Sequence, residues 1–271
     1  MLLAVDIGNS NTKFGVYDGE RLIFKLSIPT IRELSADDLS KIVGNKIEHP
    51  ISSAIVSSVV PEIDNAMDGF LNFKFHVNPV FVKNDFDFGL TINYTPLADT
   101  GADRLVNTFS AVEKYGAPCI VCSFGTALTI DVVDANRTLI GGLIAPGMNS
   151  LATALKITTS KLPEVEIKLP DAVIQTTTIG SIQSGIVFGY FGLVENLISK
   201  VKSEPGAVAT GFFAVRGTGA QSLPLPVPTP TVIATGGFAK LIAENTTQID
   251  IVEENLLLDG LRRLHARIGL C

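Results

Sequence analysis

Asp6 is a lone acid near the start of the chain, followed by a small polar run, GNSNT at residues 8–12, and then by Lys13. The apolar residues before it (2–5) and the alternating residues after it (14–17) predict a β-hairpin with the polar run as its turn. Such a turn can direct backbone N–H groups and hydroxyls at a phosphate, and Asp6 can hold Mg²⁺ beside it. The alternative is a plain hairpin whose Asp and Asn residues only form the turn.

The middle of the chain repeats this design in PCIVCSFGTALTIDVVD, residues 118–134. A constant offset of 117 residues (123 − 6) matches Asp6 with Ser123, Gly8 with Gly125, Asn9 with Thr126, Thr12 with Thr129 and Val16 with Val133. An internal repeat of this kind indicates two similar domains, each with a phosphate-binding hairpin. A third glycine turn, in VIATGGFAKLIA at 232–243, predicts a strand, a turn and an amphipathic helix that suit a nucleotide's sugar or base.

The segment GADR at residues 101–104 leads into a predicted helix, RLVNTFSAVEKYG, whose apolar residues recur at helical spacing. Asp103 can accept the proton of a substrate hydroxyl that attacks a γ-phosphoryl group. The neighbouring Arg104 can bind a substrate carboxylate or the developing phosphoryl charge. The alternative for Asp103 is a helix N-cap, because acids are common at helix starts.

Taken together, these motifs resemble one branch of the superfamily of sugar kinases, acetate kinase, actin and the heat-shock chaperones: the type III pantothenate kinases. The resembling blocks follow the family's order along nearly the whole chain: DIGNSNTKFG (6–15), GADRLVN (101–107), SFGTALT (123–129), GGLIAPGM (141–148), SIQSGIVFGY (181–190), ATGG (234–237) and NLLLDGL (255–261). The resemblance implies ATP-dependent phosphorylation of pantothenate to 4′-phosphopantothenate, the first step toward coenzyme A.

The resemblance also implies roles for individual residues. Asp103 would be the catalytic base, and Asp6 would organise Mg²⁺. The ATP-binding set would be Asp6, Ile7, Gly8, Asn9, Ser10, Asn11, Thr12, Lys13 and Thr126. The pantothenate-binding set would be Tyr94, Gly101, Ala102, Asp103, Arg104 and Thr178, with a plain strand residue as the alternative for Tyr94.

The chain departs from the family pattern at three places. Ser123 stands where the family has an aspartate associated with a monovalent cation, potassium or ammonium, so we expect a weakened cation site that Asp131 compensates in part. Thr177 stands where an asparagine usually precedes Thr178. Residues 203–230 form a longer, glycine- and proline-rich connection, for which we expect a surface excursion.

A long helix is predicted within residues 175–201, and its glycines 185, 189 and 192 share one bare face. That face permits close packing either within the core or across a dimer interface. The resemblance favours the second, because the family is dimeric with substrate sites near the subunit boundary. We therefore expect a homodimer.

The composition narrows the classes of function. A net charge of −6 and a pI near 5.1 argue against a nucleic-acid partner. The chain shows neither a signal-peptide pattern nor an apolar run of about 20 residues, so we expect no membrane contact and a cytoplasmic location. Cys119 and Cys122 would point to opposite faces of one strand, which favours core thiols over a metal site.

These observations predict an α/β protein of two similar domains, each a mixed sheet flanked by helices, in the actin-like (ribonuclease H-like) duplication with a cleft between them. The domains would be 1–115 and 116–271, although the last helix commonly crosses back in this superfamily. Two alternative functions are a ligand-binding regulatory accessory factor and another small-molecule kinase. The retained Asp6, Asp103 and Arg104 argue against the former.

Overall fold

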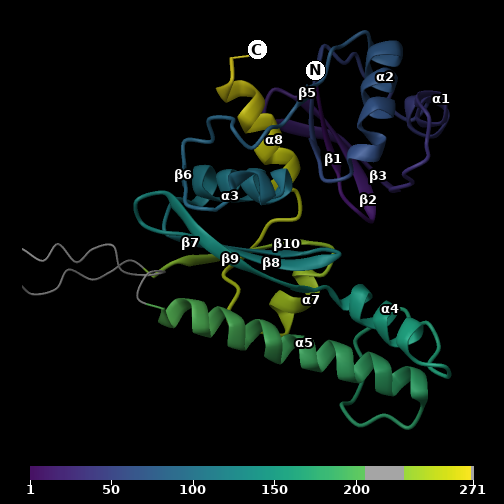
Figure 1. Cartoon of the computed structure of the whole chain (residues 1–271), viewed down its shortest axis with the longest axis vertical. Coiled ribbons are helices and arrows are strands. Elements are labelled where there is room, and N and C mark those ends of the chain that lie inside the picture. The colour runs from purple at the N-terminus through teal and green to yellow at the C-terminus, as the bar shows by residue number, and fades with distance from the viewer. Residues whose placement is uncertain (205–228, 270–271) are drawn as a thin grey trace, which may run out of the picture. The chain divides into compact units, whose positions relative to one another are not determined.

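The computed structural model describes residues 1–204 and 229–269 (Figure 1). Most of the predicted excursion, residues 205–228, lies outside the described part, as does Cys271. The chain divides into two compact units. Unit 1 contains Met1–Leu90, Tyr94–Lys114 and the segment from Asn255 onward, and unit 2 contains Thr91–Asn93 and Tyr115–Glu254.

Unit 1 is built on a five-stranded mixed sheet in the order β3-β2-β1-β4-β5. Its strands are β1 (Leu2–Ile7), β2 (Asn11–Asp18), β3 (Arg21–Pro29), β4 (Ser53–Ser58) and β5 (Val80–Phe81). The first three are joined antiparallel, whereas β4 and β5 run parallel to β1. The predicted first hairpin is therefore present, as β1 and β2.

Helices cover both faces of the unit 1 sheet. One apolar core contains the side chains of Leu3, Val5 and Ile7 on β1. It also contains apolar residues of α1 (Ala36–Leu39), of the short π-helix Ser40–Gly44 and of α2 (Asp64–Phe75). On the other face α8 (Leu256–Arg267) packs on β1, β2 and β4. The helix α3 (Ala102–Tyr115) approaches α8 closely, because a side chain at Gly260 would meet Cγ1 of Val106 at 2.8 Å.

Unit 2 has a six-stranded sheet in the order β11-β10-β7-β8-β9-β6. Its strands are β6 (Thr91–Ile92), β7 (Cys119–Phe124), β8 (Ala127–Val133), β9 (Thr138–Pro146), β10 (Thr231–Gly236) and β11 (Ile251–Val252). Its helices are α4 (Met148–Thr158), α5 (Thr178–Ser203) and α7 (Ala239–Glu244). The helices α4, α5 and α7 lie on one side of this sheet (Figure 1). Their side chains form one apolar core with those of β7, β8 and β10.

The two sheets share one strand arrangement, which confirms the predicted duplication. In each, three antiparallel strands are followed by two parallel ones, so that β7 to β11 repeat β1 to β5 and β6 is an added edge strand. The repeated order also makes β10, with the Thr-Gly-Gly turn, the counterpart of β4.

The constant offset between the hairpins is wrong beyond the turn. Asp6 pairs with Lys13, whereas Ser123 pairs with Thr129, so the second turn is one residue shorter and Lys13, not Thr12, corresponds to Thr129. Burial agrees, since Thr12 and Leu128 are both buried and Lys13 and Thr129 are both partly exposed. Because side chains alternate along a strand, a slip of one residue exchanges its two faces.

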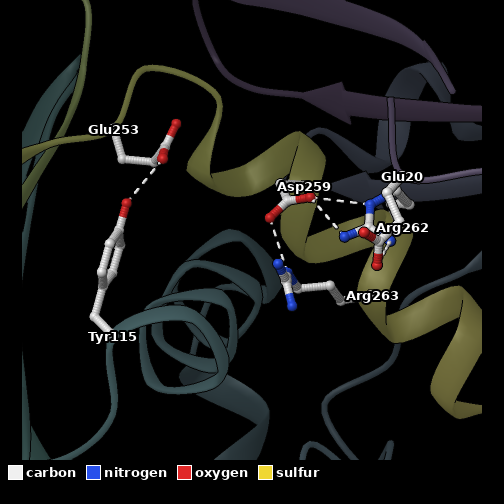
Figure 2. Close-up of polar contacts among 6 residues, drawn as sticks. All are labelled: Glu20, Tyr115, Glu253, Asp259, Arg262 and Arg263. Atoms are coloured by element: carbon white, nitrogen blue, oxygen red, sulfur yellow. Dashed lines mark hydrogen bonds and ion pairs between the residues drawn. The ribbon is translucent and has the colours of Figure 1, made fainter. Parts of the chain in front are cut away.

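The segment from Asn255 onward packs in unit 1, although the division by sequence grouped it with residues 116–254. Within α8, Asp259 accepts hydrogen bonds from Nε of Arg262 and Nε of Arg263, at 3.0 and 2.8 Å, and Nη1 of Arg262 lies 3.8 Å from Oε1 of Glu20, in the turn between β2 and β3 (Figure 2). Within unit 2, Tyr115 donates a hydrogen bond to Glu253 at 2.9 Å (Figure 2). Burial of the apolar side chains of α8 against β1, β2 and β4 therefore returns the chain's last helix to the first sheet.

Candidate functional site

The predicted metal-side acid, Asp6, lies at the carboxyl end of β1 and is 6% exposed. Its cross-strand neighbours are Lys13 on β2 and Ser57 on β4. The Nζ of Lys13 lies 3.4 Å from Oδ2 of Asp6. Burial raises the pKa of Asp6 to about 6; the ammonium of Lys13 opposes this rise and the carboxylate of Asp103 adds to it. Asp6 and Asp103, the two acids predicted to act in phosphoryl transfer, are thus close enough for the charge of Asp103 to affect the ionisation of Asp6.

The turn of the first hairpin is braced by Thr30, which follows β3. Its Oγ1 donates to the carbonyl oxygen of Gly8 at 2.7 Å and lies 2.9 Å from Oγ1 of Thr12. The backbone N–H of Thr30 donates to the carbonyl of Ser10 at 3.0 Å. Thr12 is buried, and the contact of its hydroxyl with Thr30 therefore stabilises the turn on its interior side.

The remaining residues of the predicted ATP-binding run differ in exposure. Asn9, Ser10 and Asn11 are exposed, and Gly8 and Lys13 are partly exposed. Ile7 packs its side chain into the core of unit 1, so that only its backbone is available to a ligand. The polar side chains of the turn are thus accessible while its apolar member anchors it.

Asp103 lies in the first turn of α3, where its Oδ1 accepts a hydrogen bond from the backbone N–H of Arg104 at 2.9 Å. The N-cap alternative is wrong, because Gly101 precedes the helix and its carbonyl accepts the N–H groups of Arg104 and Leu105. Any side chain at Gly101 would overlap Oδ1 of Asp103. Burial raises the pKa of Asp103, although the Arg104 N–H and guanidinium oppose the rise.

Arg104 and Tyr94 are brought together by the fold. Nη1 of Arg104 donates to the Tyr94 hydroxyl at 3.2 Å, and the guanidinium lies 5.0 Å from the centre of the Tyr94 ring. Tyr94 follows β6 in an irregular segment, so the alternative of a plain strand residue is wrong. A buried guanidinium and a phenol hydroxyl together suit a carboxylate.

The donor set of unit 1 fits Mg²⁺. This ion keeps several water ligands and takes one or two carboxylates together with substrate phosphates. Asp6 supplies a buried carboxylate and Asp103 a partly exposed one, and the charge of Asp103 disfavours the ionisation of Asp6, which a dication would relieve. No cluster of three or more His, Cys, Asp or Glu side chains that could hold a metal occurs in residues 1–204 and 229–269, so the described chain builds no closed protein cage.

The second hairpin turn is braced by the segment that follows β9. The carbonyl of Thr126 accepts hydrogen bonds from the Gly147 N–H at 3.0 Å and from the Ser150 hydroxyl at 2.6 Å. A side chain at Gly147 would overlap the carbonyl of Gly125. The glycine is thus required where the start of α4 meets the turn.

Ser123 belongs to a row of neutral hydroxyls. Its cross-strand neighbours are Thr129 on β8 and Thr235 on β10, the positions that Lys13 and Ser57 occupy beside Asp6 in unit 1. Asp131 lies on the same face of β8 as Thr129, two residues farther from the turn, and is buried. The second copy therefore replaces a charged pair with hydroxyl groups.

Thr178 is the first residue of α5, and Thr177 is its N-cap, accepting a hydrogen bond from the Gly180 N–H at 3.1 Å. Asparagine and threonine both cap helices, so a cap at this position is available to either residue. Thr178 borders an apolar groove of about 960 Å³ between α4 and α5. Glycines 185, 189 and 192 are exposed, and a methyl group added at any of them would meet no atom within 4 Å, so among the described residues they pack against nothing.

Sequence reasoning missed the residues that support the turns: Thr30 behind the first, Gly147 and Ser150 behind the second, and Ser57 beside Asp6. Gly147 lies in GGLIAPGM, one of the blocks that resemble the family, so its sequence could have indicated a role near the site. Thr30 directly follows β3 and Ser57 belongs to β4, and nothing in their local sequence indicates the contacts. None of the described helices is both long and apolar enough to cross a membrane.

Comparison with known families identifies the proteins that this chain resembles. The model of the type III pantothenate kinase family matches residues 2–200. A type III pantothenate kinase of Geobacillus sp. (strain WCH70) is 36% identical over 273 residues, covering 98% of each chain. That of Syntrophus aciditrophicus is 36% identical over 277 residues, covering 98% of this chain and 99% of the relative.

Solved structures share the fold at low sequence identity. A protein described as a Baf-family transcriptional activator from Campylobacter jejuni has a TM-score of 0.57 and 17% identity, covering 99% of this chain and 100% of its own. The ethanolamine utilization protein EutJ from Carboxydothermus hydrogenoformans has a TM-score of 0.52 and 11% identity, covering 97% and 89%. These likenesses concern the fold alone.

We predict that Asp6→Asn stabilises the protein in a pH-dependent way. The folded pKa of about 6 lies above the ordinary value of 3.8, so ionisation of Asp6 costs folding free energy. The gain should be absent below about pH 4, grow as pH rises to about 6, and reach at most about 3 kcal/mol, at 1.36 kcal/mol per pKa unit. Urea denaturation between pH 4 and 8 measures it, with the exposed Asp18→Asn as the control. A pH-independent difference would contradict this prediction.

Proposed function

Because this chain belongs to the type III pantothenate kinase family and is therefore a phosphotransferase, we propose that it transfers the γ-phosphoryl group of ATP to the hydroxyl of pantothenate. The product is 4′-phosphopantothenate, the first intermediate toward coenzyme A. The observation that carries the proposal is the pair of acids with raised pKa, the buried Asp6 at the end of β1 and the partly exposed Asp103 in the first turn of α3.

In this proposal Asp103 accepts the proton of the pantothenate hydroxyl as it attacks. A base whose pKa is raised toward neutrality suits this transfer better than an ordinary aspartate. Arg104 and Tyr94 bind the pantothenate carboxylate, with Gly101, Ala102 and Thr178 completing the contacts. The peptide N–H groups of the first turn, Lys13 and Thr126 bind the ATP phosphates.

Asp6 is the proposed Mg²⁺ ligand, with Asp103 nearby. When bound, Mg²⁺ neutralises charge on the phosphates. Lys13 supplies a second positive charge beside the same carboxylate, 3.4 Å from it. The burial of Asp6 strengthens both interactions, since charges attract more strongly away from water.

We propose that monovalent cations, potassium or ammonium, stimulate this enzyme less than the family pattern implies. The row Ser123, Thr129 and Thr235 offers neutral oxygens only, and these bind a cation more weakly than a carboxylate does. Asp131 lies on the same face, but two residues away along β8.

We also propose that the enzyme is a cytoplasmic homodimer whose copies meet at α5. The bare glycine face and the groove between α4 and α5 suit a second helix. Exposed apolar side chains cluster on the same segments, among them Ile157 and Ile179, at 76% and 51% exposure. The free thiols of Cys119 and Cys122 suit a reducing compartment.

The Asp103→Asn variant tests the proposed base. We expect its pantothenate-dependent turnover to fall by roughly 10²- to 10⁴-fold, since it keeps the shape but cannot accept the proton. A coupled assay that follows ADP release measures the rate, and Asp99→Asn, an exposed acid in the preceding turn, is the matched control. Full activity in Asp103→Asn would show that Asp103 is not the catalytic base. A wild type without pantothenate-dependent turnover in any cation would favour the accessory-factor alternative.

Ser123→Asp tests the cation proposal. A carboxylate at this position would restore a charged ligand, so we expect potassium activation to appear or strengthen in the variant. The measurement is the initial rate in potassium against the rate in an organic cation at equal ionic strength. Ser123→Ala is the control and should respond as the wild type does. An unchanged response in Ser123→Asp would refute the proposal.

Gly189→Gln tests the dimer. A glutamine side chain on the bare face would obstruct the approach of a second helix, and overpacking costs about 1–3 kcal/mol. We expect the dimer dissociation constant to rise by about 5- to 150-fold, measured by analytical ultracentrifugation. Ser199→Gln, an exposed position of α5 outside the groove, should leave it unchanged. A Gly189→Gln dimer as tight as the wild type would place the interface elsewhere.

A further inference from the structure

Ser57, near the carboxyl end of β4, carries an unexplained buried hydroxyl. Its residue is 0% exposed, and its Oγ has no hydrogen-bond partner among the described residues. A buried hydroxyl without a partner costs folding free energy, and such groups are uncommon in native proteins. The roles proposed above leave this hydroxyl unused.

The sheet places Ser57 beside Asp6. The two residues are register partners on the parallel strands β4 and β1. Ala54 and Val56 point into the core with α1 and α2, so Ser57 points to the opposite face, which is also the face of Asp6. Lys13 flanks Asp6 on the other side. The carboxylate thus has a cation on one neighbouring strand and a hydroxyl on the other.

Two further features tie this position to the site. The end of β4 borders the GADR turn, since a side chain at Gly101 would lie 3.7 Å from Cγ1 of Val59. In unit 2 the equivalent of Ser57 is Thr235, the register partner of Ser123, so both sheets carry a hydroxyl at this place. A hydroxyl therefore adjoins the leading residue of each hairpin turn.

We propose that Ser57 is a positioning residue, whose Oγ donates a hydrogen bond to the Asp6 carboxylate in the nucleotide-bound enzyme and orients it toward the divalent cation. Held between Lys13 and Ser57, the carboxylate keeps one orientation, and partners of this kind around a metal-binding carboxylate strengthen metal affinity. The inference rests on the proposed role of Asp6 in Mg²⁺ binding.

Ser57→Ala tests this role by calorimetric titration with the non-hydrolysable ATP analogue AMP-PNP, once with Mg²⁺ and once with EDTA. We expect the variant to bind Mg·AMP-PNP roughly 10- to 100-fold more weakly than the wild type. Its affinity for metal-free AMP-PNP should be unchanged. Its free energy of unfolding should be equal or higher, because alanine removes a buried hydroxyl that lacks a partner in the ligand-free fold.

Ser110→Ala is the matched control. Ser110 is equally buried and its Oγ also lacks a partner in the described part of the chain, but it lies where α3 meets Gly260. This variant should bind both forms of AMP-PNP as the wild type does. The inference is overturned if Ser57→Ala binds Mg·AMP-PNP normally, or if it loses metal-free AMP-PNP to the same extent.

The titration separates this inference from the proposed substrate, because no pantothenate is present. If the wild type binds Mg·AMP-PNP more tightly than AMP-PNP but does not phosphorylate pantothenate, the proposed substrate is wrong. The comparison of Ser57→Ala with the wild type then still decides the inference. If the wild type binds AMP-PNP equally tightly with Mg²⁺ and with EDTA, both the inference and the metal role of Asp6 are overturned.

Discussion

Burial of the Asp6 carboxylate is the constraint on which the unit 1 site depends. A carboxylate at the end of a core strand is costly to ionise, and here burial and the nearby Asp103 both disfavour its charged form. Cations offset this cost. Lys13 supplies one of them, and the proposed Mg²⁺ would supply another. The same burial that destabilises the ligand-free protein thus prepares a strong cation-binding group.

Duplication gave the chain two versions of this arrangement with different electrostatics. Both sheets place a hairpin turn between the first two of three antiparallel strands, and a hydroxyl on the neighbouring parallel strand. In unit 1 the leading pair is Asp6 with Lys13, whereas in unit 2 it is Ser123 with Thr129. Each turn is braced from behind by a residue outside its hairpin, Thr30 in one case and Gly147 in the other. The scaffold is shared, but only the first copy concentrates charge.

The local sequence was sufficient for both hairpins, for the helix after Arg104 and for the long helix α5, because each shows its own period of apolar residues. It was insufficient for the alignment of the two hairpins beyond their turns. A turn shortened by one residue is invisible to a constant offset, yet it moves every later residue to the opposite face. The return of α8 to the first sheet depended on contacts with strands more than two hundred residues earlier.

The sequence by itself determined the family, the duplicated architecture and the identity of the chemical groups, because these reside in residue types and short spacings. Tertiary structure alone decided which groups became neighbours. It placed Ser57 beside Asp6, Tyr94 against Arg104 and Thr30 behind the first turn. It also decided that Asp103 raises the cost of ionising Asp6, since burial and the distance between charges are properties of the folded chain.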